Sequence, residues 1–135
     1  REVYELYFSE LRPLEQVDLL QLPHIPQECQ SNYHLFFILT RTAEERDGLL
    51  AHLKQNGVHA VFHYVPLHTS PMGRKFGYRE GDLPLTEDLA ARLVRLPMYY
   101  DLMQEEQRLV IRAIGQFVAA PAAPAAGKIE QKGEK

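Results

Sequence analysis

The spacing of apolar residues along the chain predicts four helices. They are expected over residues 1–14, 42–55, 86–95 and 104–118. Pro13 would end or kink the first helix. The second begins at a capping box, in which Thr42 is followed by Glu45, and it stops at Gly57, which can take the left-handed conformation. The third is expected to begin at Thr86, because threonine is a frequent helix cap.

Two further stretches have the composition of strands. Residues 33–39 form an apolar and aromatic run, which predicts a strand buried on both faces. Residues 58–64 predict a second strand, in which His59 and His63 lie on one face. Residues 69–84 are expected to form a loop of about 16 residues, longer than most connections and of a length that is often functional. This order predicts an α+β fold, with helices on one face of a small sheet.

The end of the chain differs in composition from the rest. Residues 119–135, AAPAAPAAGKIEQKGEK, contain two prolines in an Ala-rich stretch and then small charged residues. This stretch lacks apolar periodicity, so we expect it to form a disordered tail. The folded domain is therefore expected to cover residues 1–118.

Charge and cysteine content narrow the classes of protein. The formal net charge is -3, from 15 Lys and Arg against 18 Asp and Glu. This argues against a protein that binds duplex DNA, where a basic face supplies most of the affinity. No stretch of the sequence is long and apolar enough for a membrane span. The single cysteine, Cys29, cannot form an internal disulfide, which fits a reducing compartment and predicts a cytoplasmic protein.

Histidines and basic residues gather in residues 59–77, HAVFHYVPLHTSPMGRKFG. His59 and His63 share a strand face, but four residues of strand separate them by ~13 Å, too far for one metal ion. We therefore expect the protein to bind no metal. A metal enzyme with histidine ligands is the alternative, and a stoichiometric amount of metal bound to the purified chain would support it. Arg74, Lys75 and Arg79 follow these histidines. They could receive an anion such as phosphate, or could form a solvated loop surface.

Residues 62–77, FHYVPLHTSPMGRKFG, resemble the C-terminal domain of the DegT-type nucleotide-sugar aminotransferases. These are pyridoxal-phosphate enzymes of the aspartate-aminotransferase fold. The opening helix and the segments 22–38 and 95–114 match the same family in the same order. The resemblance covers residue 1 to about residue 118. It implies the small C-terminal domain of that fold, with a short mixed or antiparallel sheet covered by helices.

The form of residues 63–77 most resembles the subgroup that aminates dTDP-4-keto-6-deoxy-D-glucose to dTDP-4-amino-4,6-dideoxy-D-galactose. This implies a role in making surface polysaccharide such as lipopolysaccharide, with pyridoxal phosphate as cofactor, glutamate as amino donor and a homodimeric enzyme. The family's catalytic lysine lies in a large N-terminal domain, and no lysine of this chain has the matching context. The lysines are Lys54, Lys75, Lys128, Lys132 and Lys135.

We therefore expect the chain to be a C-terminal part of a longer enzyme. On its own it should contain no catalytic residue, bind no pyridoxal phosphate and be inactive. A stand-alone, non-catalytic binding module derived from such a domain is the alternative.

The resemblance also implies which residues meet the substrate. It places residues 64–68 near the mouth of the active site, and it implies substrate-binding roles for His68, Tyr64, His63 and Arg74. Imidazole and phenol groups can orient a sugar hydroxyl, and a protonated imidazole can contact a diphosphate. The alternative for His68 is a structural role at the end of the preceding strand.

Overall fold

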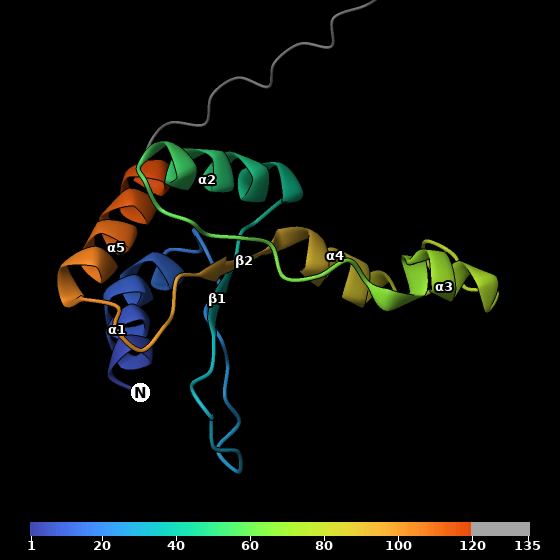
Figure 1. Ribbon diagram of the computed structural model, residues 1–135, viewed down its shortest axis with the longest axis horizontal. Coiled ribbons are helices and arrows are strands. Elements are labelled where there is room, and N and C mark those ends of the chain that lie inside the picture. The colour runs from blue at the N-terminus through green and yellow to red at the C-terminus, as the bar shows by residue number, and fades with distance from the viewer. Residues whose placement is uncertain (120–135) are drawn as a thin grey trace, which may run out of the picture.

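Helices pack against a small sheet in this molecule. The computed structural model describes residues 1–119 (Figure 1). In chain order the elements are α1 (Glu2–Gln16), β1 (Phe36–Leu39), α2 (Ala43–Gln55), the 3-10 turn η1 (Leu67–Thr69), α3 (Pro71–Lys75), α4 (Pro84–Arg92), β2 (Leu93–Leu96) and α5 (Gln104–Ala119). The predicted α+β fold is confirmed.

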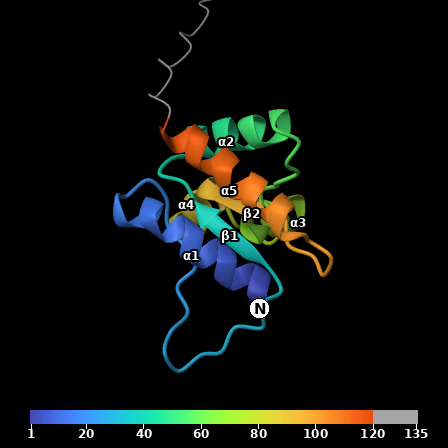
Figure 2. The same cartoon turned by 90° about the vertical axis from the view of Figure 1, so that its left-hand side faces the viewer.

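The sheet consists of β1 and β2, which pair in antiparallel orientation. Phe36 lies opposite Leu96 and Ile38 opposite Val94, and all four side chains are buried. Because side chains alternate between the faces of a strand, these four share one face. Helix α5 packs against both α1 and α2 beside the sheet (Figure 2). They complete the core with buried side chains that include Tyr7, Leu11, Leu49, Leu53 and Ile114.

The second strand does not lie where the sequence predicts it. In residues 58–64 only Val61 pairs with the sheet, opposite Arg95 of β2. The Val61 N–H donates to the Arg95 carbonyl at 3.2 Å, and the Arg95 N–H donates to the Val61 carbonyl at 2.7 Å. Residues 93–95, which the apolar spacing assigns to a helix, belong to β2 instead. Their pairing with β1 buries Val94 in the core, and this tertiary contact overrides the local helical pattern.

The first strand is shorter than predicted. Tyr33 has φ +53°, in the left-handed region, and regular strand pairing begins only at Phe36. The burial of the strand is uneven. Phe36 and Ile38 are buried on one face, whereas on the other face Leu39 is buried and Phe37 is half-buried. We call this second, only partly covered face the open face of the sheet.

The ends of α2 follow the predicted local signals. The Thr42 hydroxyl accepts a hydrogen bond from the Glu45 N–H at 3.2 Å, which satisfies a backbone donor that has no partner within the helix. Gly57, just beyond the end of α2, has φ +75°. The cap at Thr42 and the end at Gly57 are confirmed, whereas the Glu45 carboxylate of the predicted capping box accepts from the N–H of Arg41 at 3.0 Å instead of that of Thr42.

Proline lies in two other helices. Helix α4 begins at Pro84 and not at the predicted Thr86. Proline has the φ angle that the first turn of a helix requires, and the N–H that it lacks would have no partner there. Pro13 lies inside α1, which continues to Gln16, so of the two predicted effects it does not end the helix.

Residues 67–92 form an arm that extends away from the body of the molecule (Figure 1). The predicted loop 69–84 contains helix α3, which is capped by the Ser70 hydroxyl accepting from the Gly73 N–H at 3.1 Å. A Cβ atom at Gly73 would lie 2.3 Å from the Leu67 carbonyl oxygen. Only glycine therefore allows α3 to pack this closely on η1.

The predicted tail lies outside the described residues, apart from Ala119 at the end of α5. Among the helices of residues 1–119, none is long and apolar enough to cross a lipid bilayer. Cys29 is a free and exposed thiol in the connection between α1 and β1.

Candidate functional site

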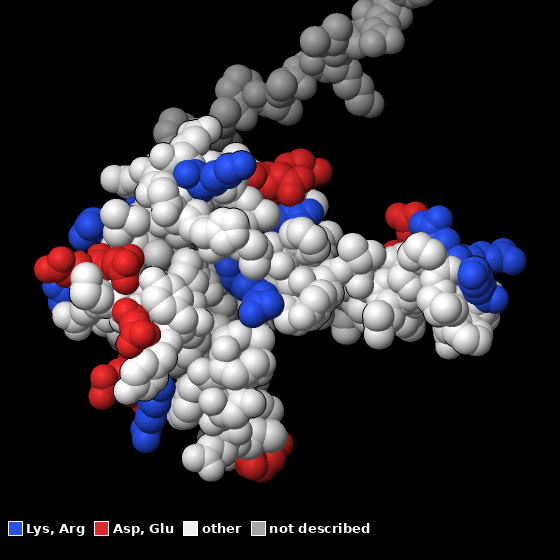
Figure 3. All heavy atoms as spheres, in the orientation of Figure 1, with Lys and Arg blue, Asp and Glu red and all other residues white. Residues whose placement is uncertain are grey.

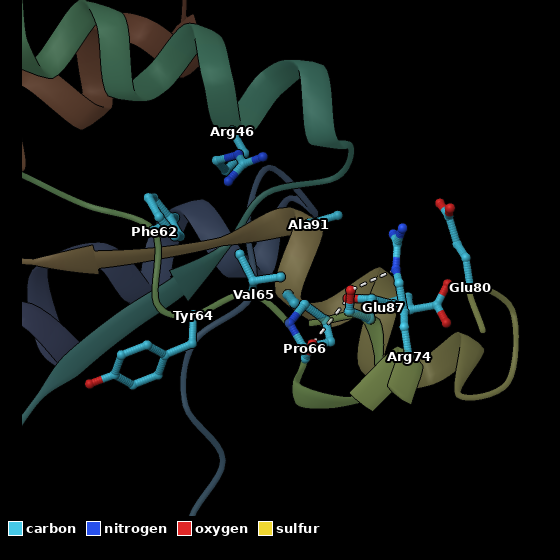
Figure 4. A pocket seen from close by; sticks show the side chains of 11 residues that line it. Arg46, Phe62, Tyr64, Val65, Pro66, Arg74, Glu80, Glu87 and Ala91 are labelled. Carbon is cyan, nitrogen blue, oxygen red and sulfur yellow. Dashed lines mark hydrogen bonds between the residues drawn. The ribbon is translucent and has the colours of Figure 1, made fainter. Parts of the chain in front are cut away.

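A hollow of about 440 Å³ lies where the arm meets the body (Figure 4). It is bounded by α2, by the extended segment before η1, and by α3 and α4 of the arm. The charged and aromatic side chains that line it are Arg46, Phe62, Tyr64, Arg74, Glu80 and Glu87. Segments far apart in the sequence thus form one concave surface.

The hollow brings together two of the four predicted substrate-binding residues. Tyr64 and Arg74 both line it, whereas His63 and His68 do not. The Tyr64 side chain is 68% exposed, and Figure 4 shows its ring directed away from Arg74. The Arg74 Nε donates to the Thr69 carbonyl at 3.1 Å, which leaves the outer guanidinium nitrogens to face the hollow. The hollow therefore offers a phenol and a guanidinium.

His68 is buried and is held by the arm itself. Its Nε2 lies 2.7 Å from Oε1 of Glu87, and this carboxylate also accepts from the Gly81 N–H at 2.8 Å. The hydrogen bond from His68, followed by that from Gly81, lowers the pKa of Glu87. Glu87 therefore joins η1, α4 and the turn before α4. Substrate binding by His68 stays a prediction, and this geometry favours a role in positioning the arm.

Arg46 lines the hollow, although nothing in the sequence singles it out. Its side chain is 19% exposed, and its Nε lies 2.8 Å from Oδ1 of Asp47. The orientation of the two groups does not make a hydrogen bond, so the buried Nε has no partner among residues 1–119. Arg46 follows a capping box and resembles other charged residues of a solvated helix face. Only the packing of α2 beside the arm shows that it faces the hollow.

His63 lies outside the hollow, next to Tyr64, with 4.3 Å between the ring centroids. Its Nδ1 is buried and makes no hydrogen bond to any described residue. Burial lowers the pKa of His63, and the nearby Arg95 and His34 act in the same direction. The lowered pKa favours the neutral imidazole, which can accept a hydrogen bond at one ring nitrogen and donate one at the other.

The described residues contain no group of three or more His, Cys, Asp or Glu side chains placed to bind a metal ion. His59 is exposed, and His68 is bonded to Glu87. The histidines of residues 59–77 therefore do not converge.

The residues that the structure describes do not fit pyridoxal phosphate by themselves. The cofactor requires an amine for a Schiff base and a cradle for its phosphate. Lys54 and Lys75 are the two lysines within residues 1–119, and both are exposed. Neither lines the hollow. No step of the chemistry can be assigned to a cofactor held by these residues alone.

The surface of the arm combines charged and apolar groups. Figure 3 shows Lys and Arg side chains at its outer end and mostly uncharged atoms between that end and the body. Three apolar side chains of the arm are largely exposed, Leu67 at 86%, Phe76 at 76% and Leu85 at 70%. A surface of this kind is typical of a site where another protein segment or a ligand packs.

Comparison with known proteins identifies a family. Residues 1–115 match the sequence model of the DegT/DnrJ/EryC1/StrS aminotransferase family. The chain is similar to the pleiotropic regulatory protein of Geobacillus stearothermophilus, with 39% identity over 93 residues, which are 68% of this chain and 25% of that protein. It is 30% identical over 120 residues to the GDP-perosamine synthase of Escherichia coli O157:H7, covering 87% of this chain and 30% of that protein.

A solved structure shows the same fold. The crystal structure of DesV from S. venezuelae, in complex with a ketimine intermediate, matches with a TM-score of 0.80 and 30% identity. The match covers 90% of this chain and 31% of that one. The chain thus spans between a quarter and a third of the length of these relatives.

Proposed function

The chain belongs to the DegT/DnrJ/EryC1/StrS aminotransferase family, and we propose that it is the C-terminal part of a nucleotide-sugar aminotransferase. The family match over residues 1–115 carries this proposal. The similarity to a GDP-perosamine synthase supports a sugar nucleotide as the substrate. The whole protein would transfer an amino group to the sugar.

The proposed reaction moves the amino group of glutamate to a dTDP-4-keto-6-deoxyhexose, giving dTDP-4-amino-4,6-dideoxygalactose for surface polysaccharide. The resemblance of residues 63–77 to the corresponding subgroup supports this choice. Pyridoxal phosphate in the whole protein supplies the electron sink that this transfer requires. The chain alone would be inactive, because the lysines of its described residues lie away from the hollow.

The partners of the chain in this proposal are a large N-terminal domain and a second copy of the whole protein. The arm carries exposed apolar side chains. They support the proposal that another domain or a second subunit covers this surface, because isolated proteins rarely leave such groups in contact with water. The large domain would supply the Schiff-base lysine and the phosphate cradle.

Within the chain, Tyr64 and Arg74 are proposed to contact the sugar nucleotide. The exposed phenol of Tyr64 can hydrogen-bond a sugar hydroxyl. The guanidinium of Arg74 can hold a diphosphate through two parallel hydrogen bonds. His63 adjoins Tyr64 and can fix the orientation of its ring, and His68 holds the arm through Glu87.

Replacing Arg74 with glutamine in the complete protein is expected to weaken binding of the sugar nucleotide. Loss of a charge-assisted hydrogen bond to a phosphate should raise the KM about 10-fold or more, with a smaller effect on kcat. Steady-state kinetics with the keto-sugar nucleotide would measure both constants. Lys75→Gln is the matched control, because it removes the same charge from an exposed neighbour that does not line the hollow. Equal KM values for the two variants would contradict the assignment of Arg74.

A further inference from the structure

The open face of the sheet carries an arginine. Arg95 lies in β2 between Val94 and Leu96, whose buried side chains point toward the helices. By the alternation of a strand, Arg95 points to the opposite face. Its directly paired neighbours are Phe37 of β1 and Val61, and side chains of such pairs lie on the same face. The half-buried Arg95 therefore lies on the open face of the sheet, which is only partly covered.

Arg95 differs from the other half-buried arginine of this region. Arg92, three residues earlier, pairs with Asp88 at 2.6 Å and donates to the Thr40 carbonyl at 2.8 Å. No carboxylate of residues 1–119 forms an ion pair with Arg95, and its guanidinium donates no hydrogen bond to another described group. Partial burial of an unpaired cation costs free energy. A bound anion would offset this unfavourable free energy.

A histidine lies in the same region as Arg95. The backbone pair of Val61 with Arg95 brings His63, two residues further along the chain, to this part of the sheet. Burial is the largest cause of the lowered pKa of His63, and the charge of Arg95 acts in the same direction. The Nδ1 of His63 has no hydrogen-bond partner within residues 1–119.

We propose that Arg95 and His63 form an oxyanion-binding site on the open face of the sheet, which takes the carboxylate or phosphate group of a small molecule. The planar guanidinium can bind either group through two hydrogen bonds, and the imidazole of His63 can add one. The guanidinium charge forms no ion pair with a described carboxylate, which favours an anion over a neutral ligand. The choice of candidate ligands depends on the proposed function, whose substrates include an amino acid and a diphosphate. The site itself is inferred only from residues of this chain.

An anion at this site changes the protonation of His63. A nearby negative charge favours the imidazolium form, so it raises the pKa of His63. The histidine gains a proton as the anion binds. Binding should therefore be strongest below the raised pKa and weaken as the pH rises through it. The groups that face His63 are Arg95 from β2, His34 from the segment before β1, and Tyr64 beside it.

The test is a titration of the complete 135-residue chain followed by NMR of the histidine imidazole nitrogens. L-Glutamate and inorganic pyrophosphate are added separately at constant ionic strength. We expect the His63 signals to shift and its pKa to rise with at least one probe. Arg95→Gln should weaken binding about 10-fold, since it removes the charge-assisted hydrogen bonds. Arg95→Lys, which keeps the charge without the planar fork, should give an intermediate loss.

Arg108→Gln is the control, because Arg108 is an exposed arginine of α5. A response to glutamate alone assigns a carboxylate site, and a response to pyrophosphate alone assigns a phosphate site. Unchanged His63 signals with both probes would overturn the proposal, as would equal affinities of Arg95→Gln and Arg108→Gln. The titration contains no catalytic step, so its outcome is independent of whether the whole protein is an aminotransferase.

Discussion

Replacing Phe36 with alanine is expected to lower the free energy of unfolding by about 3–5 kcal/mol, the range for loss of a large buried aromatic side chain. Phe36 is fully buried, and its ring contacts those of Tyr4 at 4.9 Å and Tyr7 at 5.2 Å between centroids. These contacts join β1 to α1. The loss would therefore leave a cavity between the sheet and the helix that packs on it.

Phe37→Ala is the matched control on the same strand. Phe37 is half-buried on the open face, so its removal deletes the same atoms with less loss of packing. Urea denaturation followed by circular dichroism would measure both variants in the 135-residue chain. If Phe37→Ala proved as destabilising as Phe36→Ala, the assignment of the core to the helical face of the sheet would be contradicted.

Replacing Glu87 with alanine in the complete protein is expected to loosen the arm and to raise the KM for the sugar nucleotide about 10-fold. The substitution leaves buried His68 and the Gly81 N–H without the acceptor that joins them. Backbone amides of residues 67–82 should then exchange hydrogen faster, while those of β1 and β2 remain protected. Hydrogen exchange of the complete protein would separate an effect on the arm from general unfolding.

Two variants make the effect of Glu87 specific. Glu87→Gln retains an oxygen that can accept from His68, so it should restore most of the protection. Asp88→Ala removes the neighbouring carboxylate, which pairs with Arg92, and should leave the arm protected. If Glu87→Ala and Asp88→Ala accelerated hydrogen exchange of residues 67–82 equally, the hydrogen bond between His68 and Glu87 would not be what positions the arm.

The stability of the contact between His68 and Glu87 also depends on pH in a defined direction. The hydrogen bond from His68 lowers the pKa of Glu87 below its ordinary value. A carboxylate with a lowered pKa in the folded state contributes stability above its unfolded pKa, and this contribution is lost as the pH falls through the folded pKa. Protection of the arm should therefore decrease in acid, and Glu87→Gln should remove this dependence.

The sequence alone predicts those features that short-range interactions determine. Thr42 and Gly57 act within one turn of α2, so their roles can be read without knowledge of the rest of the fold. The position of β2 cannot, because Leu93 and Val94 suit a helix face as well as a strand. Their strand conformation depends on β1, which lies more than 50 residues earlier in the chain.

The sequence alone also predicts only part of the candidate site. The composition of residues 59–77 marks the region of Tyr64 and Arg74, and the hollow brings both together. Glu87 and Arg46 have no recognisable signal, since each is one of many charged residues on a helix. Glu87 meets His68 across 19 residues of chain, and Arg46 reaches the hollow from α2. Only the folded arrangement shows these contacts.

Transfer of nitrogen from labelled glutamate to a sugar nucleotide is the most direct test of the proposed function. The complete protein encoded by the native reading frame would be incubated with pyridoxal phosphate, ¹⁵N-glutamate and dTDP-4-keto-6-deoxyglucose. We predict a ¹⁵N-labelled amino sugar nucleotide as the product, with no product from the 135-residue chain alone. A folded, complete protein that transferred no label to this or related keto-sugar nucleotides would contradict the account and would favour a non-catalytic binding module.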